Sequence, residues 1–414
     1  MDCPTRILRA RLPCPGLALW LLLAAAGLSG LRPVDSLAVG IRLPNQDPEG
    51  IARGNAFVAT ADNPSAIYYN PAGITQLEGH NFHVGLYLIS ADTDYTSPTG
   101  AKAHTDASFQ PVPQLHYVYS PKDSPFSFGL GIYAPFGLAI DWGNNPPFRT
   151  LVQEGKLAYA SFNPVVAYQI HETLSVGIGP TIDYSQATFK RGIGVLPDDQ
   201  FKFEGDGVGV GFNAGLRWQP HRQWAFGVNY RHATSIDYDG HSQTTPSPPL
   251  KPKTSTSAEL QFPRFVVTGV SYRPTEKWNI EFDIDWTDWD NVNTVVFKGT
   301  AYGDIPFVFN YKSSLMYNFG VTRQLGNGWH VSAGYIFSEN SIPDRNFNPV
   351  VPDSDLHLGS IGFGHRGQRW NWAFGYHFAY NGDGRTVKNS VPGGADGKYE
   401  TLNHAFNLSA TLKF

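Results

Sequence analysis

Large apolar residues alternate with small or polar ones along most of the chain from about residue 80 onward. Because successive side chains of a β-strand point to opposite faces, this period of two predicts strands with one apolar face. The clearest run places its large residues at Trp370, Trp372, Phe374, Tyr376, Phe378 and Tyr380. A second run, from His404 to Phe414, ends the chain on an aromatic residue.

Two architectures have this alternation: a soluble sandwich with its apolar face inside, and a transmembrane barrel with its apolar face toward lipid. The connections favour the barrel. Short turns are predicted at residues 121–125, 171–173, 220–223, 274–277, 325–328 and 366–369. Longer polar stretches alternate with them, near residues 94–107, 137–155, 190–203, 240–257, 300–309, 340–355 and 383–399. Short turns at one end and long loops at the other are typical of an outer-membrane barrel.

Six short and seven long connections join fourteen strands, and an even number puts both ends of the barrel in the periplasm. Trp224, Trp278, Trp329 and Trp370 each begin a strand just after a short turn, where a periplasmic aromatic girdle is expected. The predicted fold is therefore all-β: residues 80–414 form a 14-stranded antiparallel transmembrane β-barrel. Its predicted location is an outer membrane of the Gram-negative type.

The first 38 residues predict a signal peptide. Arg6, Arg9 and Arg11 precede an apolar stretch from Leu17 to Leu28, and small residues end at Ala38, after which cleavage is expected. The alternative is a membrane anchor that stays attached. Both cysteines of the chain, Cys3 and Cys14, lie in this leader, so the mature protein is expected to contain no thiol. No later apolar run approaches the length of a membrane helix.

Residues 39–79 do not alternate and are interrupted by glycine and proline. A fourteen-stranded barrel has a lumen wider than its own side chains fill, so this segment is predicted to be a hatch that plugs the lumen. The other interpretation is a periplasmic tail. Apolar residues such as Phe57 and Tyr68 make a solvated tail unfavourable.

Three motifs in this segment, residues 52–56, 63–66 and Asn70-Pro71-Ala72-Gly73, closely resemble the N-terminal hatch of the FadL family of outer-membrane transporters for long-chain fatty acids and hydrocarbons. The resemblance continues along the mature chain, at residues 262–265, 341–344 and 351–355. It implies that Asn70, Pro71 and Ala72 form the hatch motif. It also implies that Pro135, Phe136 and Gly137, which look like the end of the family's third strand, form a kink that opens the barrel wall.

The function that this resemblance implies is passive uptake of hydrophobic molecules, with long-chain fatty acids first and aromatic or alkane hydrocarbons as the alternative. The ligand is expected to be captured among the outer loops, to pass a hatch and to leave sideways at the kink into outer-membrane lipid. A monomer with no cofactor is expected. A general aqueous porin is a less favoured alternative, because a porin has no need of some forty plugging residues.

Two further residues are singled out. Lys312 is predicted to lie on the inward face with Ser314 and Met316 and to pair with a fatty-acid carboxylate, because an unpaired buried charge costs several kcal/mol. The alternative is a lysine solvated at the rim. Phe414 is predicted to be the aromatic end that the barrel-assembly machinery reads.

Other chemistry finds little support in the sequence. Residues 207–211 have the wrong glycine spacing for a nucleotide loop, and no GxSxG elbow or HExxH pair is present, so neither an enzyme nor a metal site is predicted. Glu281, Asp283 and Asp285 lack the central glycine of a calcium loop and are expected to face a water-filled lumen. The net charge of −4 argues against nucleic-acid binding.

Overall fold

The computed structural model describes residues 41–106, 108–196, 198–245, 253–391 and 394–414. The predicted signal peptide and the first two residues of the predicted hatch lie outside this part of the chain. Three short helical elements precede the strands: α2 (Pro48–Ala52), α3 (Ala66–Tyr69) and the 3₁₀ helix η1 (Pro71–Gln76). Two more 3₁₀ helices, η2 (Trp289–Asn291) and η3 (Asp344–Asn346), lie in the loops.

The strands are β1 (Gly79–Thr96), β2 (Lys102–His104), β3 (Gln110–Ser120), β4 (Phe126–Tyr133), β5 (Leu138–Asp141), β6 (Glu154–His171), β7 (Leu174–Arg191), β8 (Gln200–His221), β9 (Trp224–Arg231), β10 (Thr234–Thr245), β11 (Lys253–Phe262), β12 (Phe265–Thr275), β13 (Trp278–Thr287), β14 (Thr294–Thr300), β15 (Gly303–Val308), β16 (Ser314–Gly326), β17 (Trp329–Ser338), β18 (Leu356–Arg366), β19 (Trp370–Tyr380), β20 (Arg385–Val387) and β21 (Gly397–Lys413).

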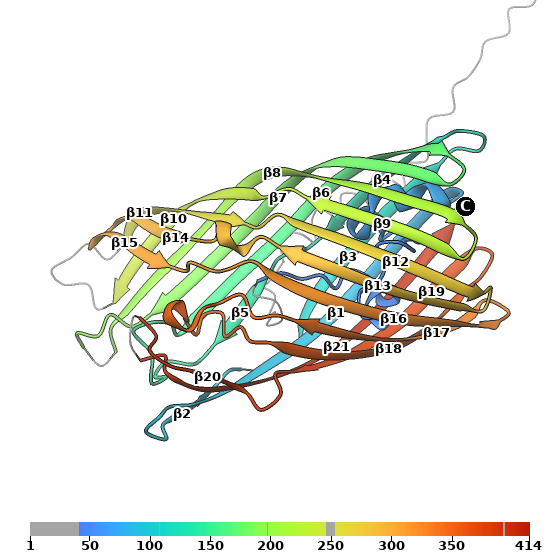
Figure 1. Cartoon of the computed structure of the whole chain (residues 1–414). Helices are drawn as coiled ribbons and strands as arrows, with labels where there is room; N and C mark the ends of the chain where they lie inside the picture. The colour runs from blue at the N-terminus through green and yellow to red at the C-terminus, as the bar shows by residue number, and fades with distance from the viewer. Residues whose placement is uncertain (1–40, 107, 197, 246–252, 392–393) are drawn as a thin grey trace, which may run out of the picture. The chain divides into compact units, whose positions relative to one another are not determined.

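These segments form a closed antiparallel barrel of fourteen strands, as predicted (Figure 1). The last strand pairs with the first over a long register, from Asn81 opposite Lys413 to Thr96 opposite Lys398. The predicted short turns fall between strands, as at 121–125 between β3 and β4 and at 327–328 between β16 and β17. The fourteen strands comprise twenty-one segments, because several strands are interrupted, the third of them between β4 and β5.

The strands are longer than the sequence pattern indicated. β1 ends at Thr96, β7 ends at Arg191 and β8 begins at Gln200, so all three strands extend into stretches that were predicted to be loops. The physical reason is that a strand which continues beyond the lipid band has water on its outer face. Polar residues are then acceptable on both faces, so the alternation disappears while the ladder of backbone hydrogen bonds continues.

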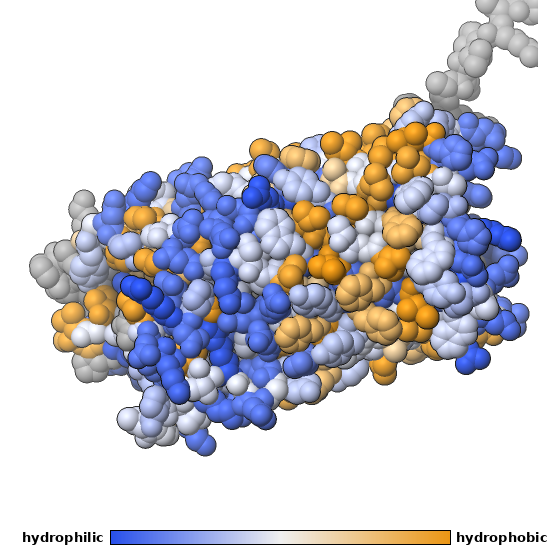
Figure 2. Space-filling view, viewed as in Figure 1, coloured by the Kyte–Doolittle hydropathy of each residue, from blue (hydrophilic) through white to orange (hydrophobic). Residues whose placement is uncertain are grey.

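The alternation places large apolar side chains outside the barrel. Phe363, Leu408 and Trp370 are exposed, whereas Ala405 and His377, which alternate with such residues, are buried. Figure 2 shows hydrophobic side chains gathered in a band over the wall, with polar side chains toward both ends. An outward apolar band between polar ends is what a barrel in lipid requires.

Residues 41–78, here called the N-terminal segment, lie against the inner face of the barrel. The segment contacts strands on several sides: the amide of Gly54 donates to Ser360 Oγ on β18 at 3.1 Å, and Asn213 Nδ2 on β8 donates to the carbonyl of Ile67 at 2.8 Å. Nearly all residues from 41 to 74 are buried. The lumen is therefore filled by the chain itself at this level.

Candidate functional site

Carboxylates on the inner face of β13 hold the N-terminal segment. The amides of residues 57 and 58 donate to Asp283 Oδ2 at 2.8 and 3.0 Å, and the amides of residues 59 and 60 donate to Glu281 Oε1 at 2.8 and 3.2 Å. Four consecutive backbone donors that would otherwise be buried without a partner are thereby satisfied. The barrel wall thus supplies the hydrogen bonds that this turn of the segment cannot make within itself.

The third carboxylate of the row, Asp285, forms an ion pair with Arg42 at 2.7 Å, and both side chains are buried. The guanidinium of Arg42 also lies 3.6 Å from the ring centre of Phe265. The expectation that this acidic row faces a water-filled lumen is therefore wrong. The carboxylates face the N-terminal segment, because the amides and the guanidinium of that segment neutralise and hydrogen-bond them in place of water.

The third strand is interrupted between Tyr133 and Leu138, and the N-terminal segment pairs with the interruption. The amide of Leu43 donates to the carbonyl of Pro135 at 2.8 Å, and the amide of Gly137 donates to the carbonyl of Ile41 at 2.9 Å. A single antiparallel bridge joins Arg42 to Phe136. The backbone groups of the predicted kink thus bond to the N-terminal segment, because proline at 135 offers no amide to a strand ladder.

This interruption leaves part of the wall without a ladder. β3 pairs with β4 only from Leu115 opposite Ile132 to Tyr119 opposite Phe128. Phe136 turns inward, is almost fully buried, and packs its ring against Tyr159 and Phe262 at 5.2 and 4.9 Å.

The motif Asn70-Pro71-Ala72 fixes the N-terminal segment against β7 and β8. Asn70 Nδ2 donates to the carbonyls of Val58 at 2.7 Å and Leu216 at 3.0 Å, while its Oδ1 accepts from the amide of Ala72 at 3.2 Å. The wall comes so close here that a Cβ atom at Gly215 would lie 2.2 Å from Asn70 Oδ1. Glycine at this strand position therefore makes room for the motif.

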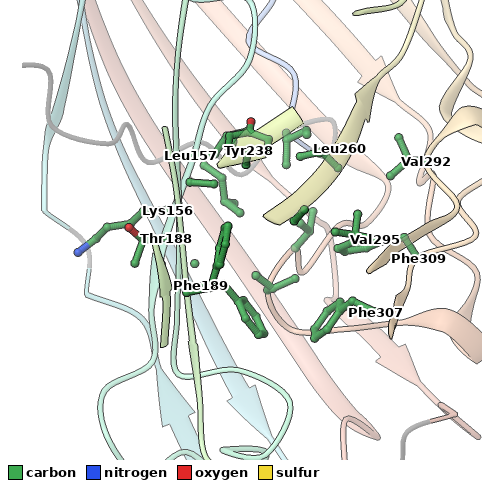
Figure 3. Close-up of a pocket in the computed structure, with 18 of the residues that line it drawn as sticks. Lys156, Leu157, Thr188, Phe189, Tyr238, Leu260, Val292, Val295, Phe307 and Phe309 are labelled. Carbon is green, nitrogen blue, oxygen red and sulfur yellow. The ribbon is translucent and has the colours of Figure 1, made fainter. Parts of the chain in front are cut away.

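An apolar pocket of about 120 Å³ lies in the outer half of the molecule. The strands β5, β6, β7, β8, β10, β11, β14 and β15 and the loops beside them line it. Figure 3 shows Leu157 and Phe189 on one side and Leu260, Val295 and Phe309 on the other. Ile41 and Leu138, which flank the interruption of the third strand, also line the pocket. A concave, mostly apolar cavity is the usual form of a small-molecule site.

Polar groups at this pocket are few. Of the described residues that line it, Lys156 alone is charged; its amine is paired with Glu154 and points away from the cavity (Figure 3). The hydroxyl of Tyr311 is buried without a hydrogen-bond partner among the described residues. Burial, with a contribution from Asp353, raises the pKa of Tyr311, so its hydroxyl remains a donor at neutral pH.

Lys312 does not lie where the alternation predicted. Its side chain is exposed and is absent from the described lining of the pocket, whereas its neighbour Tyr311 lines it. The reason is that β16 begins only at Ser314, and the chain before it follows an irregular path in which the amide of Lys312 donates to Ser341. Alternation cannot be extended across a strand end, so the prediction named Lys312 whereas the neighbouring residue, Tyr311, lines the pocket.

At the opposite end of the barrel, Arg366 on β18 binds two acidic residues of the N-terminal segment. Its Nη1 lies 2.9 Å from Asp62 Oδ2, and its Nη2 contacts Glu49. A polar cavity of about 720 Å³ adjoins this cluster and is lined by residues of the short turns. Phe414 also lies at this end, with an exposed ring beside His80.

The described residues contain no group of three or more His, Cys, Asp or Glu side chains arranged to hold a metal ion. No helix in the described part of the chain is long and apolar enough to cross a membrane.

Fold and site together define a class of protein: an outer-membrane barrel whose lumen is occupied by its own N-terminal segment and whose outer half encloses an apolar pocket. The chain belongs to the family of outer membrane protein transport proteins (OMPP1/FadL/TodX), whose model matches residues 34–414.

Individual relatives and solved structures are similar to the chain over most of its length. The long-chain fatty acid transport protein of Escherichia coli O6:H1 is 24% identical, over 80% of this chain and 84% of that protein. Outer membrane protein P1 of Haemophilus influenzae is 22% identical, over 84% and 85%. Among solved structures, a FadL homologue of Pseudomonas aeruginosa has a TM-score of 0.79 at 18% identity, covering 91% of this chain and 100% of that one. The Pseudomonas putida toluene transporter TodX has a TM-score of 0.70 at 16% identity, covering 92% and 100%.

The predicted family is thus confirmed, and with it the location in the outer membrane. The chain is a transport protein for hydrophobic compounds and not an enzyme.

Proposed function

We propose that this protein carries long-chain fatty acids passively across the outer membrane, and that residues 39–79 act as a hatch. The observation that carries the proposal is the continuity between the apolar pocket and the interrupted third strand. Ile41 and Leu138 line the pocket, and the backbone of the same two residues flanks Gly137. A molecule bound in the pocket therefore lies next to a break in the wall.

The alkyl chain would occupy the pocket, because aliphatic and aromatic side chains there remove it from water at a gain of about 0.8 kcal/mol per methylene group. The carboxyl group would accept a hydrogen bond from Tyr311, which makes none to the described residues. The name of the Escherichia coli relative, long-chain fatty acid transport protein, supports the same substrate class.

Release would proceed sideways at the interruption. Leu43 and Ile41 bond to Pro135 and Gly137, so this part of the N-terminal segment must separate from the wall, and Phe136 must turn away from Tyr159 and Phe262, before the passage opens. The bilayer then receives the molecule directly, without a crossing of the aqueous lumen. No energy source is required, since transfer to lipid is itself favourable for an apolar chain.

A neutral hydrocarbon is the second candidate substrate. The observation that favours it is that the amine of Lys156 points away from the pocket, so no charged group of the described lining faces a bound molecule. A buried carboxylate without a countercharge is costly. A protonated fatty acid, or one whose carboxylate stays at the pocket mouth, avoids this cost.

Mass spectrometry of the lipid extract of the purified protein tests the proposal. A stoichiometric fatty acid supports it. Absence of any bound acyl chain, together with retention of added hydrocarbon and no retention of added oleate, would replace the fatty acid by the hydrocarbon. Ready passage of sugars through the protein in liposomes would instead indicate an aqueous porin.

A further inference from the structure

The barrel wall has a second interruption, between the eighth and ninth strands. β10 pairs with β11 continuously, from Thr234 opposite Phe262 to Gln243 opposite Lys253. On its other side, β11 is in register with β14 at one position among the described residues, Ser257 opposite Lys298. The regular ladder of the lower wall ends at Phe265 opposite Thr287.

The ladder stops because the two neighbouring strands have different numbers of residues over the same height of the wall. Two fixed points bound the gap: the hydrogen bond of 3.0 Å from the amide of Asp288 to the carbonyl of Arg264, and the bridge of Ser257 and Lys298. Between them the eighth strand has residues 258–263, whereas the ninth strand has the longer stretch 289–297. The extra residues form η2, which turns Trp289 inward, where it is fully buried. At this place in the wall, the edges of the eighth and ninth strands face each other, and no ladder of hydrogen bonds joins these described residues.

A cavity of about 170 Å³ occupies this gap. Residues from both sides of the gap line it, among them Glu259, Gln261 and Lys298. It shares Leu260, Val292 and Val295 with the apolar pocket, so the same three side chains separate the two spaces. Figure 3 shows these three residues together on one side of the pocket, across from Leu157 and Phe189.

The height of the gap on the wall suits an amphiphilic molecule. Ile284 and Phe282 on β13 point outward as part of the apolar band, and the guanidinium of Arg264 lies 5.9 Å from the ring centre of Trp286 at the upper end of that strand. Tryptophan and arginine in this arrangement are typical of the border between hydrocarbon and headgroups. The gap begins directly above them.

The hairpin of β14 and β15 has little backbone pairing with the wall. The pairing between these strands runs from Thr294 opposite Val308 to Thr300 opposite Gly303. Its only described ladder contact with the rest of the barrel is the bridge of Ser257 and Lys298. This hairpin nevertheless supplies Val295, Phe297 and Phe307 to the apolar pocket. Movement of this side wall would break few backbone hydrogen bonds and would separate the rings of Phe297 and Phe307 from those of Phe203 and Phe189.

We propose that the gap between β11 and β14 is a side portal through which fatty acids already dissolved in the outer leaflet enter the apolar pocket tail first, with the β14–β15 hairpin as its movable edge. This proposal rests on the proposed function and adds an entry route distinct from release at the third strand. The headgroup-level position lets the carboxylate stay hydrated while Leu260, Val292 and Val295 give way to the alkyl chain.

A disulfide that pins the hairpin tests the portal. Ser257 and Lys298 face each other across an antiparallel bridge, and such Cα separations fall within the range that a disulfide spans. The variant S257C/K298C introduces the only thiols beyond the leader, because residues 41–414 contain no cysteine. The matched control is K202C/Q243C, a register pair on the continuous ladder of β8 and β10.

Uptake of radiolabelled oleate by cells that express each variant as their only transporter is measured before and after reduction, and equilibrium binding of oleate is measured on purified protein. The expected result is that oxidised S257C/K298C loses most of its uptake rate, regains it on reduction and binds oleate at equilibrium as the parent does. The oxidised control keeps the parental rate. Recovery on reduction shows that the variant folds.

Parental uptake by the fully oxidised S257C/K298C protein would overturn the portal while leaving the proposed function intact. Loss of uptake in the oxidised control as well would also overturn it, since general stiffening of the wall would then be the cause. If the parent protein neither binds nor imports oleate, the proposed function fails, and the portal for fatty acids fails with it.

Discussion

His80 and Phe414 close the barrel by exchanging two backbone hydrogen bonds. The amide of His80 donates to the backbone oxygen of Phe414, and the amide of Phe414 donates to the carbonyl of His80, each at 3.0 Å. Their rings stack with centres 5.1 Å apart. The last residue of the chain is therefore part of the seam between β1 and β21.

Deletion of Phe414 should lower the amount of barrel assembled in the outer membrane, because it removes the two hydrogen bonds that Phe414 adds to one end of the seam and the aromatic end predicted to be read during insertion. Molecules that do assemble should transport at the parental rate, since the pocket lies at the other end. Heat-modifiable migration on gels measures assembly. Phe414→Tyr, which keeps the ring and the backbone, is the control; equal yields of the deletion variant and the parent would contradict the prediction.

Asp283→Ala should release the N-terminal segment. The amides of residues 57 and 58 lose their acceptor, and each buried donor left unpaired costs about 1–3 kcal/mol. We expect protease to cleave the segment faster while the barrel migrates as before. Asp237→Ala, which removes an exposed carboxylate from the outer face of β10, should leave the cleavage rate unchanged. Equal protection of both variants would show that Asp283 does not hold the segment.

Gly137→Trp should slow the uptake of hydrophobic substrate while the barrel still assembles. Gly137 is buried where the N-terminal segment meets the interrupted third strand, and a large side chain there would fill the proposed exit. Gly359→Trp is the control, because a Cβ at Gly359 meets no atom within 4 Å. An assembled Gly137→Trp protein that imports oleate as fast as the control would remove the exit from this position.

Tyr311→Phe should weaken the binding of oleate more than that of methyl oleate. A typical hydrogen bond contributes about 0.5–1.5 kcal/mol, and about 1.5–3 kcal/mol when one partner is charged. Lys312→Ala should change neither affinity, because this side chain is exposed outside the pocket. Selective loss of oleate in Lys312→Ala would restore the original assignment of Lys312 and count against Tyr311.

The contact of Asp62 with Arg366 should persist in moderately acidic solution. Burial acts to raise the pKa of Asp62, but Arg366, with smaller contributions from Arg273 and Arg53, lowers it overall. A lowered folded pKa means that the contact stabilises the protein above the unfolded pKa of about 3.9 and is lost as pH falls through the folded value. The N-terminal segment should therefore resist protease equally at about pH 5 and pH 7. Asp62→Asn should reduce resistance at both, and a parental loss near pH 5 would contradict this.

Alternation predicted the barrel because the lipid boundary imposes the same rule on every strand. It also placed Glu281, Asp283 and Asp285 on the inner face, but not their partners, because one sequence does not reveal which of several polar segments fills a lumen. The two interruptions of the barrel wall were harder to predict from the sequence. Pro135 and Gly137 marked the first only through family resemblance, and the gap at residues 289–297 depends on a difference in length between neighbouring strands. The pocket also includes aromatic residues such as Phe307 on β15 and Phe309 just after it, from a stretch in which the sequence shows no regular alternation.

The hydrogen bonds of the N-terminal segment reach far along the chain: 226 residues separate Phe57 from Asp283, and 304 separate Asp62 from Arg366. Contacts of such high sequence separation require the closure of long loops, which costs conformational entropy. The N-terminal segment therefore cannot complete these contacts before the ninth and twelfth strands have been synthesised. The amides of residues 57 to 60 therefore meet Asp283 and Glu281 only after more than two hundred further residues of the chain have been made.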